Sequence, residues 1–163
     1  PGMVGMMENV FINNKGKSYT MTADVELSND KTNGVIIAQA GRFGGWSLYM
    51  KDGKVHHVYN FFGLEQTNIS SAKALAPGKH AIKYQFDYDG GKPGSGGNCI
   101  LYVDGQKVAE GRIPKTQPFT FSADEGVDVG MDSETVVTDD YKQGANSFTG
   151  TIYQIKVDTE PQK

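Results

Sequence analysis

Apolar and polar residues alternate with a period of two along most of the chain, a pattern typical of β-strands with one buried face. Segment 20–27 (TMTADVEL) places four apolar residues on one face, namely Met21, Ala23, Val25 and Leu27. Segment 80–88 (HAIKYQFDY) repeats the scheme with Ile82, Tyr84, Phe86 and Tyr88. Between them, 34–41 (GVIIAQAG) is apolar enough to predict a strand that is buried on both sides.

Two Asp-Gly pairs predict tight β-hairpins, at Asp52-Gly53 within 46–60 and at Asp104-Gly105 within 99–111. Segments 119–130 and 148–158 supply two further strands. We interpret 63–80 as an irregular connection and 89–98 as a glycine-rich loop. Roughly ten to twelve short antiparallel strands without helices predict an all-β fold, a two-sheet antiparallel β-sandwich or jelly roll. The length predicts one domain over 1–163.

The single tryptophan belongs to a strand in which the two faces can be separated. Trp46, Leu48 and Met50 share one face of 46–51, and Ser47, Tyr49 and Lys51 share the other. This pattern predicts that Trp46 lies in the core and that Tyr49 faces solvent. The alternative, an exposed indole that serves as a platform for a sugar, stays open at this stage.

Charge and composition narrow the class of partner. The formal net charge is −3, and the 16 Lys and Arg residues are scattered without a basic stripe, which argues against nucleic acid. The longest apolar run is too short to span a bilayer, and no signal peptide is visible. One cysteine excludes an internal disulfide. The first residue is Pro1 rather than Met, so we expect the chain to be cut from a longer polypeptide.

No pattern of catalytic residues emerges. Cys99 lies among apolar neighbours, as expected for an inert buried thiol. His56 and His57 are adjacent in a strand and point to opposite faces, so they cannot bind one metal together. A phosphate-binding loop ending in Gly16-Lys17-Ser18 would need glycine where Phe11 stands. We therefore predict no catalytic residues.

An acidic segment near the C-terminus suggests one cofactor, a calcium ion. Calcium prefers several carboxylate and carbonyl oxygens, and alternation places Asp124, Asp128 and Asp132 on one face. Together with Asp139, and with Glu125 and Asp140 nearby, they form a candidate calcium site. Surface acids without a metal are the alternative.

Five stretches in order resemble the C-terminal accessory region of large bacterial arylsulfatase-type sulfatases: GRFGGWSLYMKDGKVHHVYNFFG, DYDGGKPGSGG, LYVDGQKVAEGRI, FSADEGVDVGMDS and FTGTIYQIKVD. The resemblance runs from about Met3 to Val157 and implies a concanavalin A-like (laminin G-like) jelly roll appended to a catalytic domain. That family's Cys/Ser-x-Pro-x-Arg motif is absent here, because Cys99 is followed by Ile-Leu-Tyr-Val. The resemblance leaves a bacterial periplasmic or extracellular location open.

Two functions follow. The resemblance implies a non-catalytic accessory domain that packs on a sulfatase catalytic domain or partner subunit, in which case the isolated domain should expose an apolar patch. The alternative is a lectin-like module that binds glycans, including sulfated ones, through Arg42, Tyr49, Tyr59 and Asn60, with Phe61 and Phe62 beyond them. Arg42 could equally cap a turn or pair with a nearby acid. A glycoside hydrolase on the same fold is disfavoured, since no Glu-x-Asp-x-x-Glu pattern is present.

Overall fold

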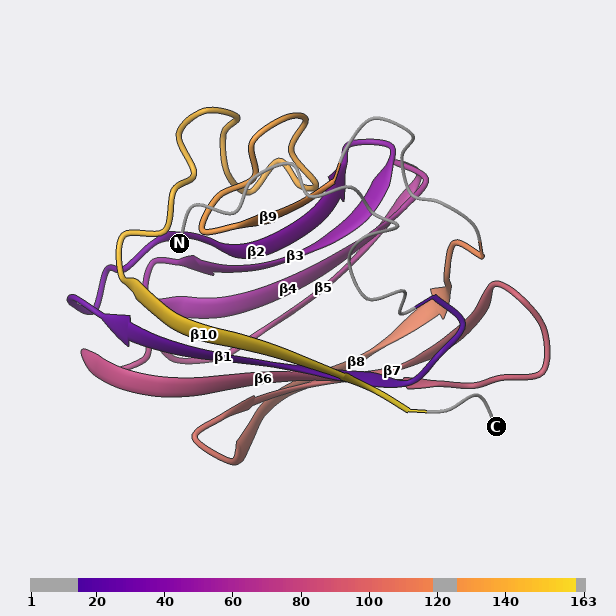
Figure 1. The fold of residues 1–163 in the computed structure, drawn as a ribbon, viewed down its shortest axis with the longest axis horizontal. Helices are drawn as coiled ribbons and strands as arrows, with labels where there is room; N and C mark the ends of the chain where they lie inside the picture. Colours follow the sequence, from indigo (N-terminus) through magenta and orange to yellow (C-terminus); the bar gives the residue numbers. More distant parts are fainter. Residues whose placement is uncertain (1–14, 119–125, 161–163) are drawn as a thin grey trace.

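The computed structural model describes residues 15–118 and 126–160, which contain ten β-strands and no helix (Figure 1). The strands are β1 (Tyr19–Leu27), β2 (Gly34–Gly41), β3 (Gly44–Lys51), β4 (Lys54–Phe61), β5 (Glu65–Ser70), β6 (Gly78–Tyr88), β7 (Ser95–Val103), β8 (Gln106–Lys115), β9 (Val127–Val129) and β10 (Thr151–Thr159). Sheet A has the order β5-β4-β3-β2-β9 and sheet B the order β10-β1-β6-β7-β8. All strand pairs are antiparallel, so the predicted two-sheet sandwich is confirmed.

The core forms between the sheets from the faces that alternation predicts. On β1, the four residues Met21, Ala23, Val25 and Leu27 are all buried. On the neighbouring β6, Ile82, Tyr84 and Phe86 face the same core, and Tyr88 packs partly buried at its end. The predicted hairpin turns also form, with Asp52 and Asp104 in the left-handed conformation before their glycines.

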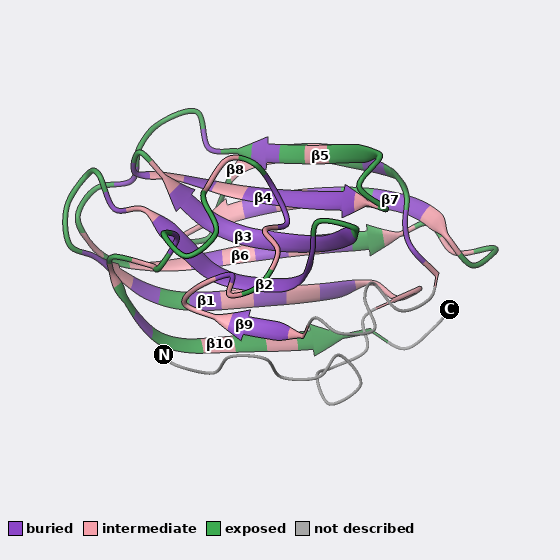
Figure 2. Cartoon of the chain, turned by 90° about the horizontal axis from the view of Figure 1, so that it is seen from above, coloured by how far each residue is buried: buried purple, intermediate pink, exposed green. Residues whose placement is uncertain are grey.

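Strand β2 is buried along its whole length, as predicted, because both of its faces are covered. One face contributes Ile36 to the core between the sheets. The other face carries Val35 and Ala38, which pack in a second cluster with Val137 and Tyr141 from residues 131–147. We call residues 131–147 the covering segment, since they lie over the outer face of sheet A (Figure 1). Figure 2 shows the result as continuous burial along β2 and β3, in contrast to the exposed edge strands β5 and β10.

Trp46 lies in the core, as predicted, with 1% of its surface exposed. Its indole N–H donates to the side-chain oxygen of Gln39, its cross-strand neighbour, at 2.8 Å. The prediction that Tyr49 faces solvent is wrong, because the covering segment buries the outer face of β3 and leaves Tyr49 only 1% exposed.

Two boundaries differ from the sequence prediction. The expected irregular connection 63–80 contains the edge strand β5, and the expected glycine loop 89–98 is shorter because β7 already begins at Ser95. Gly97 pairs with Tyr88 in that strand, and only glycine fits there because a Cβ would lie 2.4 Å from the carbonyl oxygen of Asp87. Of the strand expected in 119–130, only β9 falls in the described part; residues 119–125 lie outside it.

Candidate functional site

Two turns meet at one end of sheet A. Strands β3 and β4 pair antiparallel with Gly45 opposite Asn60, so the β2–β3 turn at 42–43 lies beside the β4–β5 turn at 62–64. The backbones touch so closely that a Cβ on Gly63 would lie 2.9 Å from the carbonyl oxygen of Arg42. We call these two turns and their side chains the rim.

Asn60 holds the rim together from beneath. Its side-chain amide donates to the carbonyl oxygens of Arg42 (3.1 Å) and Val137 (2.9 Å). Its side-chain oxygen accepts the backbone N–H of Gly63 at 2.8 Å. Since Asn60 is 1% exposed, one buried side chain ties both turns to the covering segment.

A second buried amide supports the rim from sheet B. Gln117, which follows β8, accepts the backbone N–H of Phe62 on its side-chain oxygen at 3.1 Å. Its own backbone N–H donates to the hydroxyl of Tyr59 at 2.8 Å. Burial raises the pKa of Tyr59 above its ordinary value despite that hydrogen bond, so the phenol stays protonated and neutral.

The side chains above this support are exposed and largely apolar. The exposed fractions are 72% for Phe43, 80% for Leu64 and 47% for Phe62. Among the described residues, the other large apolar side chain that is exposed to this degree is Tyr153 on β10. The rim therefore exposes apolar side chains on two turns whose backbones are held by hydrogen bonds from the buried side chains of Asn60 and Gln117.

Phe62 adopts an unusual conformation for a large side chain. Its φ is +52°, and φ at Gly63 is +71°. Two consecutive residues in the left-handed region are typical of tight hairpin turns, where Asn-Gly or Asp-Gly is the usual sequence. An aromatic residue in this region costs roughly 1–2 kcal/mol. Phe61, its neighbour, turns inward and packs edge-on against it with ring centroids 4.7 Å apart.

Arg42 precedes Phe43 in the β2–β3 turn, and its side chain is 64% exposed. Its guanidinium contacts one carboxylate oxygen of Asp139 at 3.4 Å, and the Asp139 side chain is 88% exposed. The backbone N–H of Arg42 donates to the Thr135 hydroxyl at 3.0 Å. Such an exposed, long ion pair contributes little to stability and leaves both groups accessible to a ligand.

The four residues predicted for sugar binding thus have different environments. Arg42 presents its charge to solvent, whereas Tyr59 lies buried in the core and Asn60 lies buried beneath the Arg42 backbone. Tyr49 lies elsewhere, under the covering segment, so it offers no stacking surface. Sequence reasoning missed Phe43 and Leu64; the available signal was a large apolar residue next to glycine in a turn, as in Arg-Phe-Gly and Phe-Gly-Leu.

Tyr49 instead fastens the covering segment. Its hydroxyl donates to Asp140 and accepts the side-chain N–H of Asn68 at 2.9 Å. His56 stacks on its ring at 5.0 Å, and Lys51 contacts Asp140 at 3.4 Å. Burial, reinforced by Asp140, raises the pKa of Tyr49, so this phenol does not act as a base near neutral pH.

The acids proposed as calcium ligands have different surroundings. Asp128 on β9 accepts hydrogen bonds from Ser133 of the covering segment, and Asp132 accepts the backbone N–H of Val137 and the hydroxyl of Tyr141 within that segment. Asp139 lies at the rim, and Asp124 lies outside the described residues. In 15–118 and 126–160, no three His, Cys, Asp or Glu side chains converge in a geometry that could hold a metal ion. The calcium site stays a prediction.

The adjacent histidines point to opposite faces, as predicted. His57 stacks in the core on Tyr84 at 3.6 Å between ring centroids, while His56 lies on the outer face. Cys99 is buried, and burial raises the pKa of its thiol to about 11, as expected for an inert cysteine.

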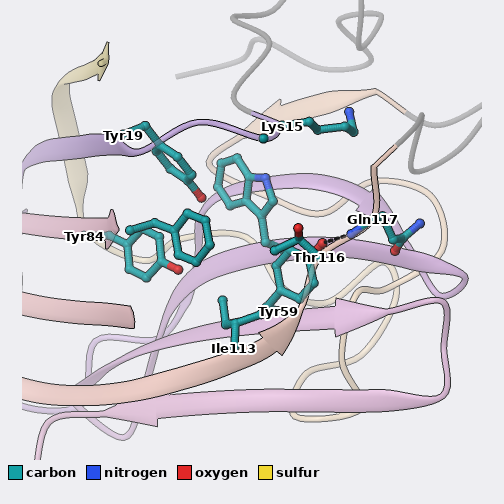
Figure 3. Close-up of a pocket in the computed structure, with 10 residues that line it drawn as sticks. Lys15, Tyr19, Tyr59, Tyr84, Ile113, Thr116 and Gln117 are labelled. Carbon is teal, nitrogen blue, oxygen red and sulfur yellow. Dashed lines mark hydrogen bonds between the residues drawn. The ribbon is translucent and has the colours of Figure 1, made fainter. Parts of the chain in front are cut away.

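A small cavity lies between the sheets under the rim (Figure 3). The rings of Tyr19, Tyr59 and Tyr84 turn toward it, and Lys15 lies at one side. Burial lowers the pKa of Lys15 to about 8. The volume is about 20 Å³, which holds about one water molecule and no sugar. This cavity is therefore too small to hold a monosaccharide.

Comparisons with known proteins identify the fold. No protein-family model matches the chain, and no curated protein does. Domains LG4–5 of the mouse laminin α1 chain superpose with a TM-score of 0.66 and 16% identity, covering 95% of this chain and 38% of the laminin fragment. The CBM40 domain of the Ruminococcus gnavus IT-sialidase, bound to α2,3-sialyllactose, gives 0.57 and 15% identity, covering 90% and 79%.

A third neighbour is the heptameric SAP-like pentraxin of Limulus polyphemus, with a TM-score of 0.52, 15% identity and coverage of 94% and 74%. Together these neighbours show a laminin G-like (concanavalin A-like) jelly roll. The chain spans little more than a third of the laminin fragment. No helix in the described part of the chain is long and apolar enough to cross a membrane.

Proposed function

We propose that this chain is a non-catalytic, lectin-like module that binds glycans at the rim. The observation that carries the proposal is that two interlocked turns expose the rings of Phe43 and Phe62, and that one of these turns also carries Arg42, which pairs with the exposed Asp139. The C–H face of a pyranose is apolar and loses water favourably on an aromatic ring. Its hydroxyl groups need donors and acceptors, which Arg42 and Asp139 provide.

The conformation of Phe62 supports the same site. The left-handed backbone would be adopted more easily by Asn, Asp or Gly, so stability alone does not explain a half-exposed phenylalanine there. The neighbours add support at the level of the fold, because one of them is a jelly roll bound to sialyllactose. We infer that the chain alone has no hydrolytic activity, because its one cysteine is buried with a raised thiol pKa and His57 is buried in the core.

The test is glycan binding by wild-type protein and single variants. Arg42→Ala and Phe43→Ala should each weaken binding about tenfold or more, because each removes a direct contact of roughly 1–2 kcal/mol. Tyr153→Ala is the matched control, since it removes an exposed aromatic side chain on β10, away from the rim. Equal affinity in all four proteins would place binding elsewhere on the surface.

A second candidate is the accessory domain of an arylsulfatase-type sulfatase, docked on its catalytic domain. The favouring observation is the exposed apolar surface of Phe43, Phe62 and Leu64, which is what a removed partner would leave behind. None of the neighbours named above is a sulfatase. Sequencing the coding DNA upstream of Pro1 tests this candidate. A continuous frame that encodes Cys/Ser-x-Pro-x-Arg would support it, and a frame without that motif would contradict it.

A further inference from the structure

The charges around the rim determine which glycans it can take. Three stretches make up the rim and the backbone behind it: residues 41–45, 60–65 and 134–139. They contain one cation, Arg42, and three exposed acids, Glu65, Glu134 and Asp139. The local formal charge is therefore +1 − 3 = −2. The arginine lies in acidic surroundings.

Glu65 follows Leu64 directly, as the first residue of β5. Glu134 precedes Thr135, whose hydroxyl binds the backbone of Arg42. A sulfate or carboxylate brought to the guanidinium would approach the like charge of Asp139, which contacts that guanidinium, in a region where exposed acids outnumber the cation. Like-charge juxtaposition opposes binding and slows association at low salt.

The hydrogen-bonding groups at the rim match an uncharged diol better than an anion. Arg42 can only donate, and Asp139 can only accept. Of two neighbouring sugar hydroxyls, one can accept from Arg42 while the other donates to Asp139. A sulfate or carboxylate has no proton to give, so it would leave Asp139 without a donor and repel it.

The existing contact between these two side chains does not prevent this arrangement. The structure records one contact from a guanidinium nitrogen to Asp139, at 3.4 Å, between two largely exposed side chains. A diol can insert next to such a pair without first breaking a strong interaction. The exposed rings of Phe43 and Phe62 on the same turns offer an apolar surface for a sugar.

We propose that the rim recognises uncharged sugar residues by their C–H face and paired hydroxyls, and that it discriminates against sulfated and sialylated ones. This inference rests on the proposed function and names its ligand class. It also reverses the expectation that Arg42 grips an anionic sugar.

The experiment measures binding to pairs of probes of which one member carries an added anionic group, namely lactose with 3′-sialyllactose and dextran with dextran sulfate. We expect the uncharged member of a pair to bind more tightly, with little change in affinity when the salt concentration is raised. Asp139→Ala should weaken that binding by roughly tenfold, because an acceptor is lost. Asp158→Ala is the control, since Asp158 forms a comparable exposed pair with Lys156 on β10.

Two outcomes contradict the inference in different ways. Tighter binding of the anionic probe, or tighter binding after Asp139→Ala, would show that Arg42 selects anions, and the glycan-binding function itself would survive. Absence of binding to all four probes at millimolar concentration would overturn both this inference and the proposed function.

Discussion

At the scale of single residues, the buried side chain of His57 makes the stability of the folded protein depend on pH. Burial lowers the pKa of His57 to about 3, and its ring stacks on Tyr84 in the core. The unfolded chain binds a proton at this residue below its ordinary pKa of about 6.5, whereas the folded chain binds none until about pH 3. Stability is therefore complete above pH 6.5 and falls as the pH decreases through this window.

The expected loss from His57 is about 2–3 kcal/mol between pH 6.5 and pH 4.5, at about 1.4 kcal/mol per pH unit. His57→Phe should flatten this part of the pH profile, measured by urea unfolding at several pH values. It should not greatly lower stability at pH 7, because the histidine Nε2 has no hydrogen-bond partner to lose. His56→Phe, on the outer face, is the comparison and should flatten the profile less, because burial lowers the pKa of His56 but Asn68 and Asp140 oppose that lowering. An identical slope in wild type and His57→Phe would contradict the assignment.

Phe62 allows stability and binding to be separated. Phe62→Asn places a residue that favours the left-handed conformation before Gly63, which stabilises the turn by roughly 1 kcal/mol. It also loses the contact with Phe61, which contributes about 0.5–1.5 kcal/mol. We expect the free energy of unfolding to change by less than about 1 kcal/mol, whereas glycan binding is lost.

Asp52→Asn is the matched control for that substitution, since Asp52 has nearly the same φ in a tight turn that already suits it. It should leave both stability and binding unchanged. A drop of several kcal/mol in Phe62→Asn would mean that the ring is a structural residue, and the argument from its conformation would fail.

At the scale of elements, the covering segment depends on a buried carboxylate. Asp132 is 2% exposed and accepts hydrogen bonds from the Tyr141 hydroxyl (2.7 Å) and the Val137 backbone N–H (3.0 Å). Tyr141→Phe removes one donor from a buried charge, which should destabilise the protein by about 1–3 kcal/mol. Hydrogen exchange should accelerate in 131–147 more than in β1 or β6, since the segment opens locally.

Tyr153→Phe is the control here, because the Tyr153 hydroxyl bonds an exposed carboxylate, Glu26, at the surface. Its loss should change stability by less than about 0.5 kcal/mol. Uniform acceleration of exchange over the whole chain in Tyr141→Phe would indicate that the covering segment does not open on its own.

Strands differ in how far alternation reveals them. On β1 the pattern is complete because one face meets the core and the other meets solvent. On β5 only Ile69 is buried, and the strand exists because its backbone pairs with β4, so its sequence carries almost no signal. Alternation assigns Tyr49 to the correct face of β3. It cannot reveal that residues 131–147, some ninety positions away, cover that face.

At the scale of the whole molecule, the fold class follows from local patterns, but the site does not. The hairpins and the strand faces are encoded within ten residues or so of each turn. The rim requires the turns at 42–43 and 62–64 to meet over Asn60, with Gln117 supporting them from the far sheet. Arg42 and Asn60 can be selected from the sequence as polar residues near a hairpin. Only tertiary packing determines that Arg42 is exposed and Asn60 is buried.

Metal binding, finally, is a property of the whole folded chain and can be tested on its unfolding. Asp128 and Asp132 already accept hydrogen bonds within the covering segment, and Asp139 lies at the rim with Arg42. We therefore expect the same melting temperature in excess calcium and in excess chelator. A site filled at one hundred times its dissociation constant would add about 2.7 kcal/mol, or roughly 5–10 °C for a chain of this length. A shift of that size, abolished by Asp128→Asn but not by Asp158→Asn, would establish the calcium site and assign these acids a ligand role that their hydrogen bonds do not require.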